Sequence, residues 1–237
     1  MNRTVRIAIG ASLGLLLLVG IVLLVTVFLP SWKAKKEQQQ QLARYRESKL
    51  QTYQQENETY ADYEVDVAFL GDSLTDGYDV ARYYPQFVVS NRGIGGDTTF
   101  DLEKRLQVSV YDLKPKVAVM LIGANNFFTS SMFENYEDIL KGLQQNLPQT
   151  KIVLLSLTNM SGNWGKFNDQ AKQNNVKIKA LAAQYGFEFV DLYTPLMNPQ
   201  TGEIYPAYTT DGGHLTDQGY EVLTAQITPV LAKLLCP

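Results

Sequence analysis

Three side chains in this sequence have the types and spacing needed for nucleophilic catalysis. Ser73 lies in the run Gly-Asp-Ser-Leu at residues 71–74, and Asp211 precedes His214 by three positions. A serine hydroxyl is a weak nucleophile until a base takes its proton, and histidine is the side chain best suited to that task near neutral pH. His214 is therefore the candidate base, and Asp211 is the candidate partner that orients the imidazole and stabilises the imidazolium.

The composition of the chain excludes several other kinds of chemistry. Its 237 residues include one His and one Cys and carry a net charge of -3. Zinc sites need clusters of His and Cys, and disulfide frameworks need paired Cys, so neither is expected. An acidic chain also lacks the basic surface that binds nucleic acid. We therefore expect no metal, no cofactor and no nucleic-acid partner.

The elements that must hold these residues follow a regular alternation after Glu64. Short apolar runs, typical of strands buried on both faces of a parallel sheet, alternate with helical stretches. This pattern predicts an α/β fold, a three-layer α/β/α sandwich around a five-stranded parallel sheet. The five predicted strands are Val65–Leu70, Phe87–Ser90, Lys116–Ile122, Lys151–Leu157 and Phe187–Leu192.

Several residues indicate where the helices begin and end. Thr98 and Ser131 each precede an acidic residue by three positions, which is the pattern of a capping box. Gly186 follows the stretch 168–185 as a C-terminal cap would, and the last helix is expected at about 216–235. Because ligands bind at the carboxyl ends of parallel strands, the loops that follow the strands are the place to look for a site.

Four short blocks in these loops resemble the motifs of the SGNH, or GDSL, hydrolase superfamily, in the same order along the chain. They are residues 71–74, Gly-Gly-Asp-Thr at 95–98, Gly-Ala-Asn-Asn at 123–126 and 211–214. The resemblance covers about residues 65–237. It implies a flavodoxin-like sandwich and a serine esterase that works through an acyl-enzyme.

The resemblance also implies an oxyanion hole. Its donors would be the backbone N–H groups of Ser73 and Gly96 and the side-chain amide of Asn125. Asn126 departs from the family, which usually has Asp at that position, and this raises the question of how the Asn125 loop is braced. The loop 159–168, which contains Trp164, is expected to form a wall for the substrate.

The family's substrates include short-chain acyl esters, lysophospholipids and O-acetylated sugars. The run Gly-Ile-Gly-Gly-Asp-Thr at 93–98 is similar to the branch that resembles platelet-activating-factor acetylhydrolase, which favours short acyl groups. The alternative from another class is a non-catalytic, membrane-tethered module that binds cell-surface glycans. An α/β-hydrolase elbow needs Gly-x-Ser-x-Gly, and Thr75 stands where its last glycine would be.

The amino-terminal part of the chain has the composition of a membrane anchor. Ile7–Leu29 contains no charged residue, and its 23 residues suffice to cross an apolar core of about 30 Å. No small-x-small cleavage site follows, so residues 1–32 are interpreted as an uncleaved transmembrane helix with Trp32 at the interface. Residues 33–64 are a polar, Gln-rich spacer, and residues 65–237 are the hydrolase domain.

The orientation of this anchor is ambiguous from charge alone. Six basic residues follow the segment and two precede it, a count that favours a cytoplasmic domain, although long domains translocate largely regardless of charge. The family's ester substrates at membranes and walls favour a single-pass protein of the cell membrane with an extracytoplasmic domain. Gly10 and Gly14 form a small-xxx-small pair that predicts a weak homodimer.

Overall fold

The computed structural model describes residues 24–236, which fall into two compact units divided after Lys49. η1 (Leu24–Phe28) leads into α2 (Leu29–Asn57), which begins in the first unit and ends in the second, and whose side chains up to residue 45 are exposed where they are described. Most of the predicted anchor Ile7–Leu29, including Gly10 and Gly14, lies outside the described residues. Within residues 24–236, no helix combines the length and the apolar character needed to span a bilayer.

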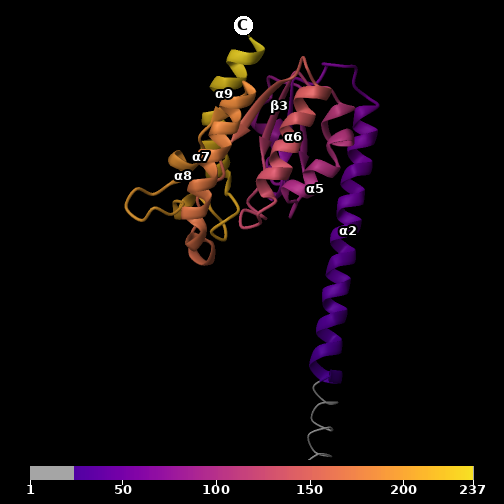
Figure 1. The fold of residues 1–237 in the computed structure, drawn as a ribbon, viewed down its shortest axis with the longest axis vertical. Coiled ribbons are helices and arrows are strands. Elements are labelled where there is room, and N and C mark those ends of the chain that lie inside the picture. The colour runs from indigo at the N-terminus through magenta and orange to yellow at the C-terminus, as the bar shows by residue number, and fades with distance from the viewer. Residues whose placement is uncertain (1–23, 237) are drawn as a thin grey trace, which may run out of the picture. The chain divides into compact units, whose positions relative to one another are not determined.

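The second unit begins at Leu50 and contains a parallel sheet of five strands in the order β2-β1-β3-β4-β5 (Figure 1). This is the doubly wound order of flavodoxin-like folds, and the predicted α/β sandwich is confirmed. The elements are β1 (Val67–Gly71), α3 (Ser73–Asp76), α4 (Val80–Tyr83), β2 (Val89–Gly93), α5 (Thr99–Lys104), η2 (Gln107–Tyr111), β3 (Val117–Leu121), α6 (Met132–Asn146), β4 (Lys151–Leu155), η3 (Gly162–Phe167), α7 (Asn168–Tyr185), β5 (Glu188–Val190), α8 (Tyr193–Leu196), η4 (Pro206–Tyr208) and α9 (Asp217–Leu235).

Each of the five predicted apolar runs overlaps one of these strands; β3, β4 and β5 lie wholly within their runs, whereas β1 ends one residue and β2 three residues beyond theirs. Every residue of β1 and β3 is buried, because helices cover both faces of the sheet. Leu70 and Met120 pack with α5, α6 and α7 on one face, whereas Phe69 and Val119 pack with α4, α8 and α9 on the other. Side chains that alternate along a strand point to opposite faces, so the two hydrophobic clusters are the two interfaces of a three-layer sandwich.

Most of the predicted helix ends are confirmed. Thr98 and Asp101 form a reciprocal capping box at the start of α5, and Gly186 ends α7 in the left-handed conformation at φ 69°. The helix predicted at about 216–235 is α9, with Thr216 as its N-cap. The predicted capping box at Ser131 is wrong: Ser131 has helical backbone angles and makes no side-chain capping bond. A capping side chain needs an extended backbone to reach the N–H groups of the first turn.

The end of α2, from Leu50 on, is part of the second unit and packs within it. Tyr53 is 2% exposed, and its hydroxyl donates to the carbonyl of Gly93 at the end of β2. The side-chain amide of Asn57 donates to the carbonyl of Val108 at 2.8 Å. The last two turns of the helix, which fall within the stretch interpreted as spacer, therefore contribute to the core of the second unit.

Candidate active site

Ser73 is the first residue of α3, two residues beyond the end of strand β1. The carboxylate of Asp72 caps this short helix by accepting the N–H of Leu74 at 3.1 Å. Gly93 on the neighbouring strand packs against the same helix, since a Cβ on Gly93 would lie 2.2 Å from the backbone nitrogen of Asp76. The turn after β1 is thus tightly packed, and it presents the Ser73 side chain at the carboxyl edge of the sheet.

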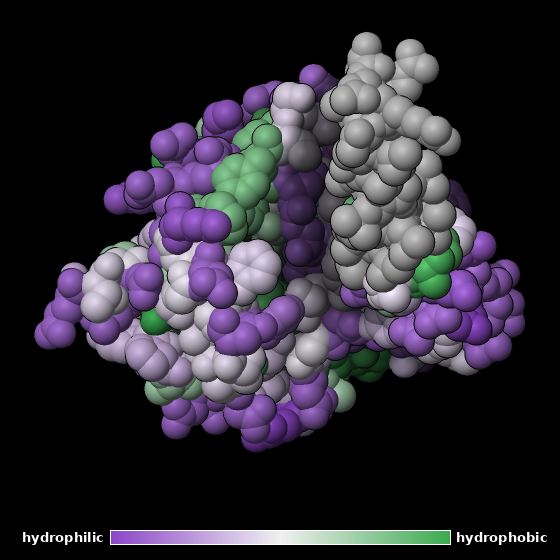
Figure 2. Space-filling model, turned by 90° about the horizontal axis from the view of Figure 1, so that it is seen from below, coloured by the Kyte–Doolittle hydropathy of each residue, from purple (hydrophilic) through white to green (hydrophobic). Residues whose placement is uncertain are grey.

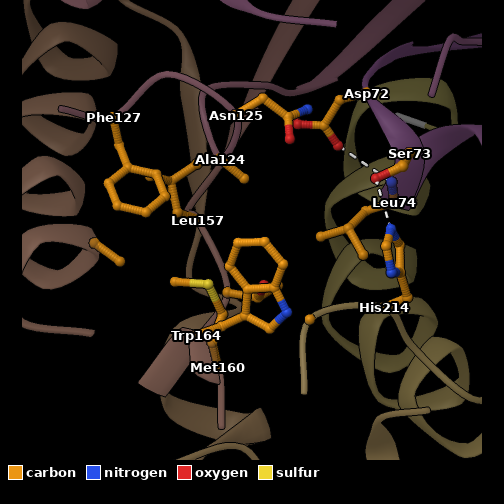
Figure 3. A pocket seen from close by; sticks show the side chains of 13 residues that line it. Asp72, Ser73, Leu74, Ala124, Asn125, Phe127, Leu157, Met160, Trp164 and His214 are labelled. Atoms are coloured by element: carbon orange, nitrogen blue, oxygen red, sulfur yellow. Dashed lines mark hydrogen bonds between the residues drawn. The ribbon is translucent and has the colours of Figure 1, made fainter. Parts of the chain in front are cut away.

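His214 and Asp211 come from the loop that precedes α9. The ring nitrogen Nε2 of His214 lies 3.1 Å from Ser73 Oγ (Figure 3). On the other side of the ring, Nδ1 lies 2.7 Å from Asp211 Oδ2. Gly212 shapes this loop: its φ is +94°, and a Cβ there would lie 2.5 Å from the carbonyl oxygen of Ser161. The structure therefore brings together the serine, the histidine and the aspartate that the sequence singled out.

The hydrogen bonds of Asp211 define its charge and the tautomer of the histidine. Its carboxylate accepts the backbone N–H of His214 and the imidazole, and these bonds, with that of Gly213 N–H, lower its pKa to about 2. An ionised carboxylate only accepts hydrogen bonds, so the imidazole proton resides on Nδ1. Nε2 then presents its lone pair to Ser73 Oγ, which is the arrangement of a general base.

Asp72 is a second carboxyl group beside the nucleophile, in a different environment. It is 1% exposed, and burial raises its pKa to about 7. One carboxyl oxygen accepts Leu74 N–H, while the other, Oδ2, is buried without a hydrogen-bond partner. Asp72 therefore caps α3 and braces the loop, and makes no hydrogen bond with His214.

The loops that follow β2 and β3 meet next to Ser73. Gly96 adopts a φ of +80°, a conformation that favours glycine, and the Asn125 side-chain amide donates to the carbonyl of Asp97 at 2.9 Å. The Asp97 carboxylate is buried in an ion pair with Arg105 Nε at 2.7 Å. The two residues predicted as oxyanion donors thus come from loops joined by a direct hydrogen bond.

Asn126 connects the Asn125 loop to the start of α5. Its side-chain oxygen accepts the N–H of Thr99 at 3.3 Å, and its amide nitrogen donates to the Thr99 hydroxyl at 2.8 Å. A carboxylate could accept from both groups of Thr99, whereas the amide accepts from one and donates to the other. The brace that the departure from Asp put in question is therefore present, in an altered form.

A cavity of about 110 Å³ opens beside Ser73 and His214. Figure 3 shows these two residues at one end and the apolar residues Phe127 and Leu157 at the other, with Trp164 between them. The remaining apolar lining comes from Leu74, Ala124, Met160 and Ala171. The side of the protein on which the loops before α6 and α9 lie is seen in Figure 2, where hydrophilic side chains surround a small apolar patch.

The sequence model of the GDSL-like lipase/acylhydrolase family matches residues 69–222. The chain belongs to this family. It is accordingly an ester hydrolase, and the family resemblance predicted from four short blocks is confirmed. A comparison with curated protein sequences found no match.

Solved structures agree with the GDSL family assignment. A protein from Streptococcus pneumonia, assigned as a platelet activating factor, is 25% identical with a TM-score of 0.76, and the match covers 84% of this chain and 98% of that one. A GDSL-like lipase from Bacteroides thetaiotaomicron is 25% identical with a TM-score of 0.69, over 78% of this chain and 98% of its own. An acetylxylan esterase from Geobacillus stearothermophilus shares the fold at 22% identity and a TM-score of 0.59, over 72% and 95% of the two chains.

Some residues of this GDSL hydrolase site carried no signal in the sequence. Arg105 is buried and joins the ends of two strands, but a single Arg on a helix does not announce such a role. Ala171 lines the cavity from α7, a helix that matches no catalytic motif. The predicted substrate wall, the loop 159–168, contributes Met160 and Trp164 to the lining of the cavity.

Proposed function

We propose that this GDSL hydrolase is a membrane-anchored serine esterase that cleaves short-chain carboxylic esters. Ser73 would be the nucleophile, His214 the base and Asp211 the residue that orients the base. The observation that carries the proposal is the continuous path Ser73 Oγ to His214 Nε2 at 3.1 Å and His214 Nδ1 to Asp211 Oδ2 at 2.7 Å. Three side chains in this arrangement form the hydrogen-bonded unit that activates a serine.

The reaction follows from the protonation states of these groups. His214 Nε2 accepts the Ser73 hydroxyl proton while Oγ forms a bond to the ester carbonyl carbon. The imidazolium then donates that proton to the departing alcohol oxygen, which leaves an acyl-serine. A water molecule, deprotonated by the same nitrogen, attacks the acyl carbon and releases the acid and Ser73. Asp211 remains ionised throughout and stabilises the imidazolium.

Charge on the carbonyl oxygen would be stabilised by the N–H groups of Ser73 and Gly96 and by the side chain of Asn125. One hydrogen of the Asn125 amide points to the Asp97 carbonyl, which fixes the orientation of that amide. The second hydrogen of the amide can then meet the oxyanion. Donors held in place before the reaction are worth more than mobile ones, because they need no reorganisation in the transition state.

The size of the cavity supports short acyl groups. Its volume is about 110 Å³, and an apolar cavity of about 150 Å³ is known to hold one benzene molecule. Acetyl, propionyl and butyryl groups are smaller than benzene or close to it, and longer chains exceed this space. We therefore propose short-chain esters, including O-acetyl groups, over long-chain lipids.

The experiment that tests this proposal is hydrolysis of p-nitrophenyl esters from acetate to long acyl chains, by the wild type and by Ser73→Ala and His214→Ala. We expect both variants to fold and to lose turnover by more than about a thousandfold. A wild-type rate in either variant would contradict the mechanism. A folded protein that neither hydrolyses esters nor reacts with a serine-directed fluorophosphonate would favour the glycan-binding alternative.

We also propose that residues 1–32 anchor the protein in the cell membrane, with the hydrolase domain on the extracytoplasmic side and a weak dimer through Gly10 and Gly14. The support is the uncharged stretch Ile7–Leu29 and the absence of a cleavage motif after it. Protease added to intact cells should digest the domain. A domain that is cleaved only after the cells are lysed would refute this placement.

A further inference from the structure

The last turns of α2 contact the end of β2, the strand that leads into the Gly96 loop. The hydroxyl of Tyr53 donates to the carbonyl of Gly93 at 2.6 Å, and Tyr53 is almost wholly buried. A buried phenol is held firmly by such a bond, because its hydroxyl would otherwise lack a partner. Gly96 follows Gly93 by only three positions, so this contact lies at the base of the loop.

Arg92 precedes Gly93, and its side chain also contacts the last two turns of α2. Its side chain is 0% exposed, and its guanidinium lies 4.8 Å from the centre of the Tyr53 ring. It donates to the Tyr53 carbonyl at 3.1 Å and lies 3.2 Å from the Glu56 carboxylate. A buried cation needs a counter-charge and hydrogen bonds, so Arg92 ties the end of β2 to α2.

A second buried arginine continues this network to the active site. Arg105 donates to the carbonyl of Arg92 and to the carbonyl of Gly71, each at 2.9 Å, and forms an ion pair with Asp97. It therefore joins the carboxyl ends of β1 and β2 to the loop after β2. The Asp97 carbonyl in turn accepts the Asn125 amide.

We propose that Tyr53 and Glu56 are positioning residues for the oxyanion hole. By fixing Gly93 and Arg92, the end of α2 sets where the Gly96 N–H lies relative to Ser73. The inference rests on the proposed catalytic role of this site. It assigns part of the active-site geometry to a helix that precedes residues 69–222, the region that the family model matches.

Tyr53→Phe in the full-length protein tests this assignment, because it removes one hydroxyl and keeps the ring beside Arg92. We expect the turnover per active site on p-nitrophenyl acetate to fall about tenfold to a hundredfold, with KM changed less than about twofold. Active sites are counted by complete labelling with a fluorophosphonate, which separates a slower enzyme from a smaller folded fraction. Glu56→Gln should lower turnover in the same way, and Tyr185→Phe on α7 is the matched control.

Turnover per labelled site within twofold of the wild type in both Tyr53→Phe and Glu56→Gln would overturn the proposal. A raised KM at unchanged turnover would overturn it as well, because a positioning effect on the oxyanion hole acts on the transition state. If Tyr53→Phe does not fold, Glu56→Gln decides alone, since its carboxylate is partly exposed. Activity in Ser73→Ala would instead refute the proposed function, whereas an inactive Ser73→Ala beside fully active Tyr53→Phe and Glu56→Gln refutes only this inference.

Discussion

Replacing Asp72 by asparagine should remove a large part of the loss of stability of this protein as the pH rises from about 4 to 8. Asp72 is buried, and burial raises its pKa from 3.8 to about 7. A carboxyl group whose pKa is higher in the folded state binds its proton more tightly there, so folding stability is greatest when the group is protonated in both states. The contribution is fully present below pH 3.8 and is lost as the pH rises through about 7.

The two pKa values also give the magnitude. Each pH unit of difference corresponds to about 1.4 kcal/mol, so the free energy of unfolding should fall by up to about 4 kcal/mol between pH 4 and pH 8 on account of Asp72. Asp72→Asn retains an oxygen that can accept Leu74 N–H and has no charge to bury. Any fixed cost of the buried amide is the same at every pH, so it does not alter the pH dependence.

The assay is urea unfolding of the two proteins, followed by circular dichroism at several pH values from 4.5 to 8.5. All other ionisable groups are shared, so the difference in unfolding free energy between variant and wild type isolates Asp72. The unfolding free energy of Asp72→Asn should increase relative to that of the wild type by several kcal/mol as the pH rises. If the difference stays constant within about 0.5 kcal/mol, the buried carboxyl does not titrate as inferred.

Three further changes have defined outcomes. Asp211→Asn should lower turnover by about 10³ to 10⁴ in ester hydrolysis, because an amide no longer fixes the imidazole tautomer; a loss below tenfold would contradict the triad. Ala171→Leu should fill part of the cavity and lower kcat/KM for p-nitrophenyl butyrate relative to p-nitrophenyl acetate by about tenfold or more. An unchanged ratio would show that the acyl group does not bind in this cavity. The free energy of unfolding of a fragment beginning at Tyr60 should be about 3 kcal/mol lower than that of one beginning at Lys33, because the shorter fragment lacks one buried aromatic ring and its hydrogen bonds. Equal urea midpoints and slopes for the two fragments would contradict the packing of the α2 end.

The strands and the three central site residues could be predicted because each depends on a local signal. A strand buried on both faces is a continuous apolar run, and each predicted run overlaps a strand of the sheet, although most of the polar strand β2 lies beyond its run. Asp211 and His214 lie three positions apart in one loop, so their spacing alone indicates a pair. The end of α7 at Gly186 could also be predicted from a local signal, because a helix end in the left-handed conformation favours glycine.

The remaining features depend on contacts between distant residues, which leave no local pattern. Arg105 reaches the carbonyls of Gly71 and Arg92, 34 and 13 positions away, so nothing near it in the sequence indicates its role. The sequence predicts a polar spacer at the end of α2 because a single buried residue, Tyr53, does not produce the repeating apolar pattern of a packed helix. Ser131 matched a capping pattern, but backbone angles decide whether a side chain can cap.

The pair formed by Asp211 and His214 is complete within four consecutive residues, whereas Ser73 lies 141 positions earlier. Asp211 Oδ1 accepts the N–H groups of Gly213 and His214, so carboxylate and imidazole are held by their own loop. The tautomer of the ring is therefore set within the loop and does not depend on Ser73. The distance from Nε2 to Ser73 Oγ depends instead on how the loop lies against the turn after β1. Substitutions that displace the loop as a whole should therefore slow acylation by lengthening that distance, while the Nδ1 hydrogen bond to Asp211 is retained.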